Sequence, residues 1–335
     1  MTVETEFKKK YKPDFGQEKI VVLYEDEYLA VIYKPDGMLS VPYPGSRART
    51  AVDVLEQIMR KKGTYSQSHR PFIVHRLDRD TSGVMMFAMT EKSQKKIMDN
   101  WQTLVTGRIY RAVAENPLGK NHDGMPNSGT INDEIAYNAH NIGFVPHDNA
   151  RPAENVKNVR KMKNRAEAGK ESSIYERNLE IKGNNVRFKT VSAVTHYKII
   201  ERGINHTLFE LSLETGRKNQ IRAHLASKGY PLAGDENYRA KTNPFERLAL
   251  HARTLEFNHP FTEEHLKFEI PEPEEWILCV KNGINPSEAM HHIHKTKSRS
   301  RRKEKTALSG ISHTSSAALR KMDFIARGKE HFHAP

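Results

Sequence analysis

The chain has 335 residues, enough for one large domain with appendages or for two smaller domains. Lys and Arg number 54 against 41 Asp and Glu, and the formal net charge of +13 attracts polyanions such as nucleic acid or an anionic membrane surface. No run approaches the roughly 18 to 20 apolar residues that span a bilayer, and the amino terminus lacks an apolar signal core, so we expect a soluble cytoplasmic protein. The single cysteine, Cys279, excludes an internal disulfide and a zinc thiolate cluster.

The amino-terminal part predicts a hairpin, a helix and a buried strand. Residues 20–24 and 28–33 are rich in β-branched and aromatic side chains and are separated by three acidic residues, as in two strands joined by a tight turn. Residues 50–59 carry apolar side chains at helical spacing, after a threonine that can cap a helix. The short, continuously apolar run 84–89 is typical of a strand buried on both faces.

Further elements continue this alternation of helix and strand. We expect a helix at 90–101, strands at 108–114, 191–200 and 207–213, and a helix at 220–228 that ends at Gly229. Hairpin-like spacing and crossovers occur together along the chain. The predicted fold class is therefore a mixed α/β or α+β arrangement around a sheet.

Two segments differ from this pattern. From about 147 to 182 the chain is rich in Arg, Lys, Glu and Asn with few large apolar residues, so we expect an exposed insertion, irregular or a solvated helix, that buries too little to order itself independently. Beyond Asn282 the sequence becomes strongly basic and loses periodicity. The histidine-rich stretch 291–294 adjoins this tract and indicates a solvated segment more than a metal site. The expected organisation is an arm at 1–14, a domain at 15–282 and a flexible tail at 283–335.

The segment 75–83 contains the clearest candidate for chemistry. Asp78 lies between Arg76 and Arg79, in a polar loop just before a buried strand. An aspartate beside guanidinium groups stays ionised and can attack an electrophilic carbon. The alternative is a structural aspartate that caps or pairs, and the residue types alone leave both open.

The same segment, His75-Arg76-Leu77-Asp78-Arg79-Asp80-Thr81-Ser82-Gly83, closely resembles the signature of the RluA family of RNA pseudouridine synthases. Every fixed position of that signature, His-Arg-Leu-Asp-x-x-Thr-Ser-Gly, is present. Further blocks resemble the family in the family's own order, and these are 29–37, 214–222, 231–235, 248–252 and 257–260. The resemblance thus covers most of the chain.

The resemblance implies a role for each matching residue. Asp78 would be the nucleophile, Tyr110 the aromatic residue that packs against the target base, and Arg222 the cation that pairs with Asp78. Arg76 would enter the RNA stack as the target uridine leaves it, because a base must be flipped out before it can react. The remaining residues expected to bind RNA are His75, Arg217 and Asn219 in the domain, and Lys295, Lys297, Arg299, Arg301 and Arg302 in the tail.

Structural alternatives and departures accompany these assignments. Tyr110 is on a predicted strand and could be a core residue, and Arg222 could cover a helix surface. Asn219 stands where the family usually has His, which leaves the local hydrogen bonding around Arg217 and Arg222 open. Residues 108–109 are Arg-Ile where the family usually has Lys-Thr.

The resemblance implies a pseudouridine synthase fold with a central, mixed and largely antiparallel sheet, flanking helices and an RNA-binding cleft. The reaction would be isomerisation of uridine to pseudouridine within RNA, without cofactor or metal. The first step (attack on C1′, attack on C6 or formation of a glycal) stays open, as does the choice between large-subunit rRNA and tRNA. The expected partner is RNA, with no membrane and no obligate protein partner, and we expect a monomer.

Two other function classes are alternatives to an RNA pseudouridine synthase. A catalytically silent RNA-binding protein of the same fold would share the basic charge but would not need Asp78. A glycoside hydrolase would need a second carboxylate as its acid, for which Asp80 and Glu214 are available. The Arg-rich surroundings suit a phosphate backbone better than a neutral sugar.

Overall fold

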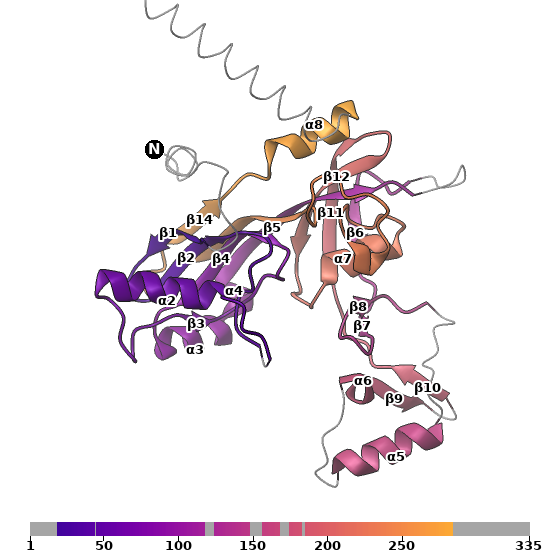
Figure 1. The fold of residues 1–335 in the computed structure, drawn as a ribbon, viewed down its shortest axis with the longest axis horizontal. Helices are drawn as coiled ribbons and strands as arrows, with labels where there is room; N and C mark the ends of the chain where they lie inside the picture. The colour runs from indigo at the N-terminus through magenta and orange to yellow at the C-terminus, as the bar shows by residue number, and fades with distance from the viewer. Residues whose placement is uncertain are drawn as a thin grey trace, which may run out of the picture. The chain divides into compact units, whose positions relative to one another are not determined.

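The computed structural model describes residues 19–43, 45–117, 124–147, 156–167, 174–182 and 185–283 (Figure 1). The arm expected at 1–14 and all five basic residues named in the tail lie outside these residues. Within them, no helix combines the length and the apolar character needed to cross a bilayer.

A single sheet organises the described chain, with the strand order β1-β2-β4-β13-β5-β12-β11-β6 and with β14 and β3 paired to β13 and β4. Its strands are β1 (Val21–Glu25), β2 (Leu29–Lys34), β3 (Phe72–Ile73), β4 (Ser82–Ala88), β5 (Val105–Glu115), β6 (Ser128–Ile131), β11 (Thr195–Arg202), β12 (His206–Leu213), β13 (Leu250–Asn258) and β14 (His265–Glu269). Only the pairing of β4 with β13 is parallel among the described strands of this sheet. The expected mixed, largely antiparallel sheet is confirmed.

Helices and short hairpins complete the described structure. The helices are α2 (Ala51–Lys62), α3 (Glu91–Asp99), α4 (Trp101–Leu104), α5 (Val156–Glu167), α6 (Ile174–Arg177), α7 (Gln220–Ser227) and α8 (Glu274–Asn282), with a 3-10 turn at Glu236–Tyr238. The two hairpins pair β7 (Ala136–Tyr137) with β8 (Gly143–Phe144) and β9 (Leu179–Lys182) with β10 (Asn185–Phe188).

The half of the sheet formed by β1, β2 and β4 has apolar layers on both faces. Val54, Leu55 and Met59 of α2 pack on one face, and Ile97 of α3 packs in the cluster on the other. All seven residues of β4 are buried, as its continuous apolar run predicted. Thr50 begins α2 with a reciprocal capping box, so the helix starts where the sequence placed it.

The other half of the sheet is covered in the same way. Ile221 and Leu225 of α7 pack against β5 and β12 on one face, and Trp276 and Val280 of α8 pack on the opposite face (Figure 1). The first residues of α7 therefore lie beside the middle of the sheet. This arrangement brings the loop before α7 to the same region as the loop before β4.

Some elements differ from their predicted bounds. The helix expected through Trp101 is interrupted at Asn100, where α3 ends and α4 begins. The strand expected from 191 starts at Thr195, and Val191 instead forms an isolated bridge with Ile135. Apolar alternation cannot separate a short bridge from the strand that follows it.

The inserted segment contains more structure than its composition suggested. Helix α5 and the β9–β10 hairpin enclose a small apolar cluster in which Val159, Leu179 and Val186 are buried. The hairpin extends to Phe188, beyond the limit of 182 expected from composition, and Phe188 meets Phe144 edge to face at 5.1 Å. A few apolar residues brought together by the hairpin are enough to order the part that the structure describes.

Candidate active site

Asp78 is in the turn that precedes β4. The amide of Thr81 donates to the carbonyl of Asp78 at 3.1 Å, which closes the turn. On the other side, buried Leu77 is held by Ser40, whose hydroxyl donates to the Leu77 carbonyl (2.6 Å) and accepts from its amide (3.2 Å). The backbone is thus fixed on both sides of the carboxylate.

A buried lysine holds the next residue of the same turn. The Lys34 ammonium, at the end of β2, donates to the carbonyls of Pro35 and Met38 at 2.7 Å and of Arg79 at 3.0 Å. Burial lowers the pKa of Lys34 to about 7, although nearby Asp36 raises it. Lys34 therefore connects the turn Lys34-Pro35-Asp36-Gly37 to the loop that carries Asp78.

Gly83 lets this loop enter the sheet beside β13. Its φ is +127°, and a Cβ atom there would lie 2.1 Å from the carbonyl oxygen of Ala252. No side chain fits this approach. Ser82, next to it, receives a hydrogen bond from Arg247 (2.7 Å), whose guanidinium also pairs with Asp36 at 2.8 Å.

The carboxylate of Asp78 meets two side chains of the α7 region. The Asn219 amide Nδ2 donates to Asp78 Oδ2 at 2.8 Å, and Arg222 Nη1 lies 3.9 Å from the same oxygen. The side chain of Asp78 is 23% exposed, which leaves it accessible from the pocket. One hydrogen-bond donor and one nearby cation from the same helix start therefore orient the carboxylate.

Arg222 has a closer partner than the one expected. Its Nε and Nη2 atoms donate to the two oxygens of buried Asp235, each at 2.7 Å. Burial lowers the pKa of Arg222, but the hydrogen bonds and charge of Asp235 outweigh it and raise the pKa overall. The expected pairing with Asp78 exists only as the longer contact, because Asp235 occupies the Nε–Nη2 edge of the guanidinium in a bidentate pair.

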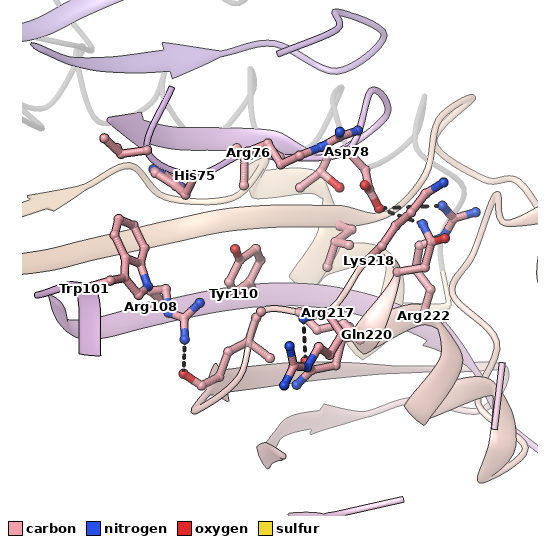
Figure 2. A pocket seen from close by; sticks show the side chains of 18 of the residues that line it. His75, Arg76, Asp78, Trp101, Arg108, Tyr110, Arg217, Lys218, Gln220 and Arg222 are labelled. Carbon is pink, nitrogen blue, oxygen red and sulfur yellow. Dashed lines mark hydrogen bonds and ion pairs between the residues drawn. The ribbon is translucent and has the colours of Figure 1, made fainter. Parts of the chain in front are cut away.

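Tyr110 projects from β5 toward the segment that carries Asp78 (Figure 2). Its ring packs partly against two apolar clusters of the sheet, so it is half core residue and half pocket wall. Burial raises the pKa of Tyr110, and the hydroxyl stays protonated at neutral pH. Tyr110 thus belongs to the core and lines the pocket, and its contact with the target base stays a prediction.

A pocket of about 530 Å³ opens between these elements. Four cations that line it, here called the cationic rim, are Arg76, Arg108, Arg217 and Lys218 (Figure 2). Among the described residues that line the pocket, Asp78 is the one carboxylate. One anion among several cations is an arrangement that suits a polyanionic ligand.

Residues 28–227 match the family model for RNA pseudouridylate synthases. The chain belongs to the RNA pseudouridylate synthase family. The uncharacterised RNA pseudouridine synthase YlyB of Bacillus subtilis (strain 168) is 33% identical over 262 residues, which cover 78% of this chain and 72% of the relative. Ribosomal large subunit pseudouridine synthase D of Neisseria meningitidis serogroup A is 32% identical over 283 residues, and the chain spans 63% of that protein's length.

Solved structures share the fold. Human RNA Pseudouridylate Synthase Domain Containing 4 superposes with a TM-score of 0.51 at 20% identity, covering 77% of this chain and 90% of that one. Human RNA Pseudouridylate Synthase Domain Containing 1 gives a TM-score of 0.52 at 17% identity, with 78% of this chain and 87% of that one covered.

The family model and the sequence relatives confirm the RluA-type resemblance, and the chain is an RNA pseudouridine synthase, an isomerase.

The other residues of this pseudouridine synthase that are expected to bind RNA differ in the contacts that they already make within the protein. Arg76 is exposed and has no hydrogen bond or ion pair within the described part of the chain. Arg217 uses its Nε to bind the carbonyl of Ser192 at 2.9 Å. His75 is engaged inside the protein, since its Nε2 accepts the amide of Met86 at 2.9 Å and its ring lies 5.1 Å from that of Trp101.

The protonation of His75 follows from this environment. Burial, with a smaller contribution from the charge of Arg108, lowers the pKa of His75 to about 3. The ring is therefore neutral at physiological pH and attracts no phosphate by charge. His75 therefore helps to hold β4 and the pocket wall in place. Its neutral ring presents no positive charge to RNA.

Several residues of the site were not predicted from the sequence. Lys218 and Arg108 complete the cationic rim, Trp101 forms part of the wall, and Asp235 holds Arg222. Asp235 was inside a recognised block, 231–235, but its role was not evident. A buried aspartate paired with an arginine 13 residues away gives no local signal in the sequence.

Proposed function

We propose that this chain converts uridine to pseudouridine in large-subunit ribosomal RNA, with Asp78 as the nucleophile. The observation that carries the proposal is a single accessible carboxylate, oriented by Asn219 and Arg222, in a pocket with the cationic rim. The choice of ribosomal RNA is supported by the relatives named ribosomal large subunit pseudouridine synthase D. Transfer RNA is the other substrate compatible with the site.

The reaction balances without any external reagent. The bond between N1 of uracil and C1′ of ribose breaks, the ring turns, and C5 is joined to C1′. The proton lost from C5 is matched by a proton gained at N1, so the product is an isomer. Attack on C1′, attack on C6 and formation of a glycal all begin with the ionised carboxylate of Asp78.

The surrounding residues have roles that follow from their geometry. The ring of Tyr110 packs against the flipped base, and its protonated hydroxyl can donate a hydrogen bond there. Arg76, exposed at the pocket mouth, takes the place that the base leaves in the RNA stack. Arg108, Arg217 and Lys218 bind phosphates and hold the flipped strand.

Among the described residues that line this pocket, the glycoside hydrolase alternative finds no second carboxylate. Asp80 pairs with Arg79 at 2.8 Å, and Glu214 pairs with His196 at 2.6 Å. Neither lines the pocket with Asp78. A silent RNA-binding protein would have no use for an accessible carboxylate among phosphate-binding cations, because that charge repels the ligand.

The test uses release of the C5 hydrogen. Transcripts of large-subunit rRNA and of tRNA, labelled with [5-³H]uridine, are incubated with the purified chain and with the Asp78→Asn variant. Tritium release from the rRNA transcript by the unaltered chain, but not by the Asp78→Asn variant, supports the proposal. Release from tRNA only would reassign the substrate, and no release from either RNA would contradict the proposed reaction. The cytoplasmic location and the monomeric state stay predictions.

A further inference from the structure

We infer that Asn219 is a positioning residue that decides which oxygen of Asp78 faces the substrate. The inference rests on the proposed function, because it assigns a task in that reaction. Asn219 is buried at the start of α7, with 8% of its surface exposed, and lies within hydrogen-bond distance of the nucleophile.

The contacts of Asp78 are unevenly divided between its two oxygens. Asn219 Nδ2 at 2.8 Å and Arg222 Nη1 at 3.9 Å both approach Oδ2. For Oδ1, the described residues provide no hydrogen bond or ion pair. Oδ1 is thus the oxygen left to attack, and the hydrogen bond on Oδ2 fixes the rotation of the carboxylate about χ2.

The orientation of the Asn219 amide is itself determined by its surroundings. Its Oδ1 accepts a weak hydrogen bond from the amide of Gly143 at 3.4 Å, on the side opposite Asp78. A flipped amide would place its oxygen against the carboxylate and its NH₂ group against an N–H donor. The flipped state therefore loses both contacts and adds a repulsion.

The backbone at Asn219 also suits this residue type. Its φ of 57° and ψ of 20° lie in the left-handed region, which Asn tolerates better than most residues. Gly143 packs closely behind it, since a Cβ atom there would be 2.9 Å from the carbonyl oxygen of Lys218. The amide is therefore held by the α7 start and by the β7–β8 hairpin together.

Asn219 and Arg222 contribute in different ways. Arg222 is already hydrogen bonded to Asp235 through two atoms, so its effect on Asp78 is mainly that of a nearby positive charge. Asn219 supplies the short, directional contact. An amide does not titrate between pH 5 and 9, so the donor of this contact is unchanged over that range.

Asn219→Asp is the sharpest variant, since it keeps the size and the tolerance of left-handed backbone but sets two carboxylates face to face. We expect kcat to fall about tenfold to hundredfold, the range for loss of a hydrogen bond to a charged group, with KM changed less than about threefold. The pH below which kcat declines should move upward, because a second carboxylate disfavours ionisation of its neighbour. Asn219→Gly, which removes the amide without backbone strain, should lower kcat and move that pH less than Asn219→Asp does, because it removes a donor without adding a charge.

The matched control is Asn141→Asp. Asn141 also has left-handed backbone, with a φ of 58°, but it lies in the turn between β7 and β8 and does not line the pocket. Its kcat, KM and pH profile should equal those of the unaltered chain. A kcat of Asn219→Asp equal to that of this control would overturn the inference.

A second measurement needs no RNA. In ¹⁵N-labelled protein, the side-chain amide signals of Asn219, assigned by their loss in Asn219→Asp, should shift in Asp78→Asn and stay in place in Asp80→Asn. Signals that do not respond to Asp78→Asn would overturn the contact whatever RNA is modified. Responsive signals combined with a chain that forms no pseudouridine would uphold the contact and would place the failure in the proposed function.

Discussion

At the scale of single residues, the site depends on one carboxylate among cations. Asp78 is 23% exposed and oriented from one side, whereas Asp80, two residues later, pairs with Arg79 at the surface. The two aspartates share a loop but have different surroundings. This difference makes them a natural pair for comparison.

The first prediction concerns this pair. Asp78→Asn should abolish pseudouridine formation, by roughly 10⁴-fold or more as for loss of a nucleophile in other enzymes, because it removes the charge at nearly constant shape. Folding and RNA binding should be largely retained, since Asp78 contributes little to the apolar core. Asp80→Asn should be mild, as an exposed ion pair is worth about 0 to 1 kcal/mol. Tritium release and RNA binding, measured on both variants, check the prediction, and turnover above a trace in Asp78→Asn would refute it.

The second prediction separates the ring of Tyr110 from its hydroxyl. Tyr110→Phe should keep RNA affinity, because the ring still packs on the base, and should lower kcat if the hydroxyl takes part in proton transfer. Tyr110→Ala should lower both RNA affinity and kcat, because the stacking of a base on an aromatic ring is worth about 1–3 kcal/mol. Binding and single-turnover rates of the two variants give the comparison. An Ala variant with unaltered binding would rule out the stacking role.

At the scale of elements, the loop before β4 is held by the end of β2. Lys34 provides this connection through three carbonyl oxygens, one of them that of Arg79. Its ammonium is fully buried, and burial lowers its pKa to about 7. Stability and catalysis should therefore respond together to a change at this position.

The third prediction follows from that pKa. Lys34→Met should reduce the free energy of unfolding by about 1–3 kcal/mol, because buried carbonyls lose their donor, and should lower kcat through the Asp78 loop. In the unaltered chain the folded state binds fewer protons at Lys34 than the unfolded state between pH 7 and 10.5, so its contribution to stability should rise with pH over this window. Denaturant titrations of both chains from pH 7 to 10 test the sign. A difference between the chains that does not change with pH would contradict it.

At the scale of the whole molecule, positive charge extends beyond the pocket. Seven lysines and arginines occur between Lys295 and Lys305, outside the residues that the structure describes. A run of cations provides charge without a fixed geometry for reading bases. Its expected contribution is therefore affinity, with the choice of uridine left to the pocket and the domain around it.

The fourth prediction tests whether the basic segment contributes affinity without selecting the uridine. Removing residues 290–335 should weaken RNA binding and flatten its salt dependence, with each lost phosphate contact changing the slope of log affinity against log salt by up to about 0.7 on single-stranded RNA. The modified position should stay the same. Affinities at several salt concentrations, measured for both chains with one RNA, give the slopes. Equal slopes would mean that this segment does not contact phosphates, and a new modification site would mean that it selects the target.

Local patterns in the sequence predicted most of the elements and the loop that carries the candidate carboxylate. The apolar run 84–89 indicated a strand buried on both faces, and the signature around Asp78 placed the carboxylate in the loop before it. Both depend on neighbours within a few residues, which periodicity and motif spacing record. The interruption of the helix at Asn100 and the order in the insertion were harder to predict from the sequence, because a local break or a small apolar cluster depends on which side chains meet in the fold.

How the site is held together follows from the packing of the folded chain. Asn219 and Asp78 are 141 residues apart, and their hydrogen bond exists because the sheet brings the start of α7 beside the start of β4. The same packing places Asp235 against Arg222 and leaves Asp78 with the longer contact from that arginine. Which of several polar side chains reaches a given oxygen is a matter of ångströms set by the packed core, and no pattern along the chain encodes such a distance.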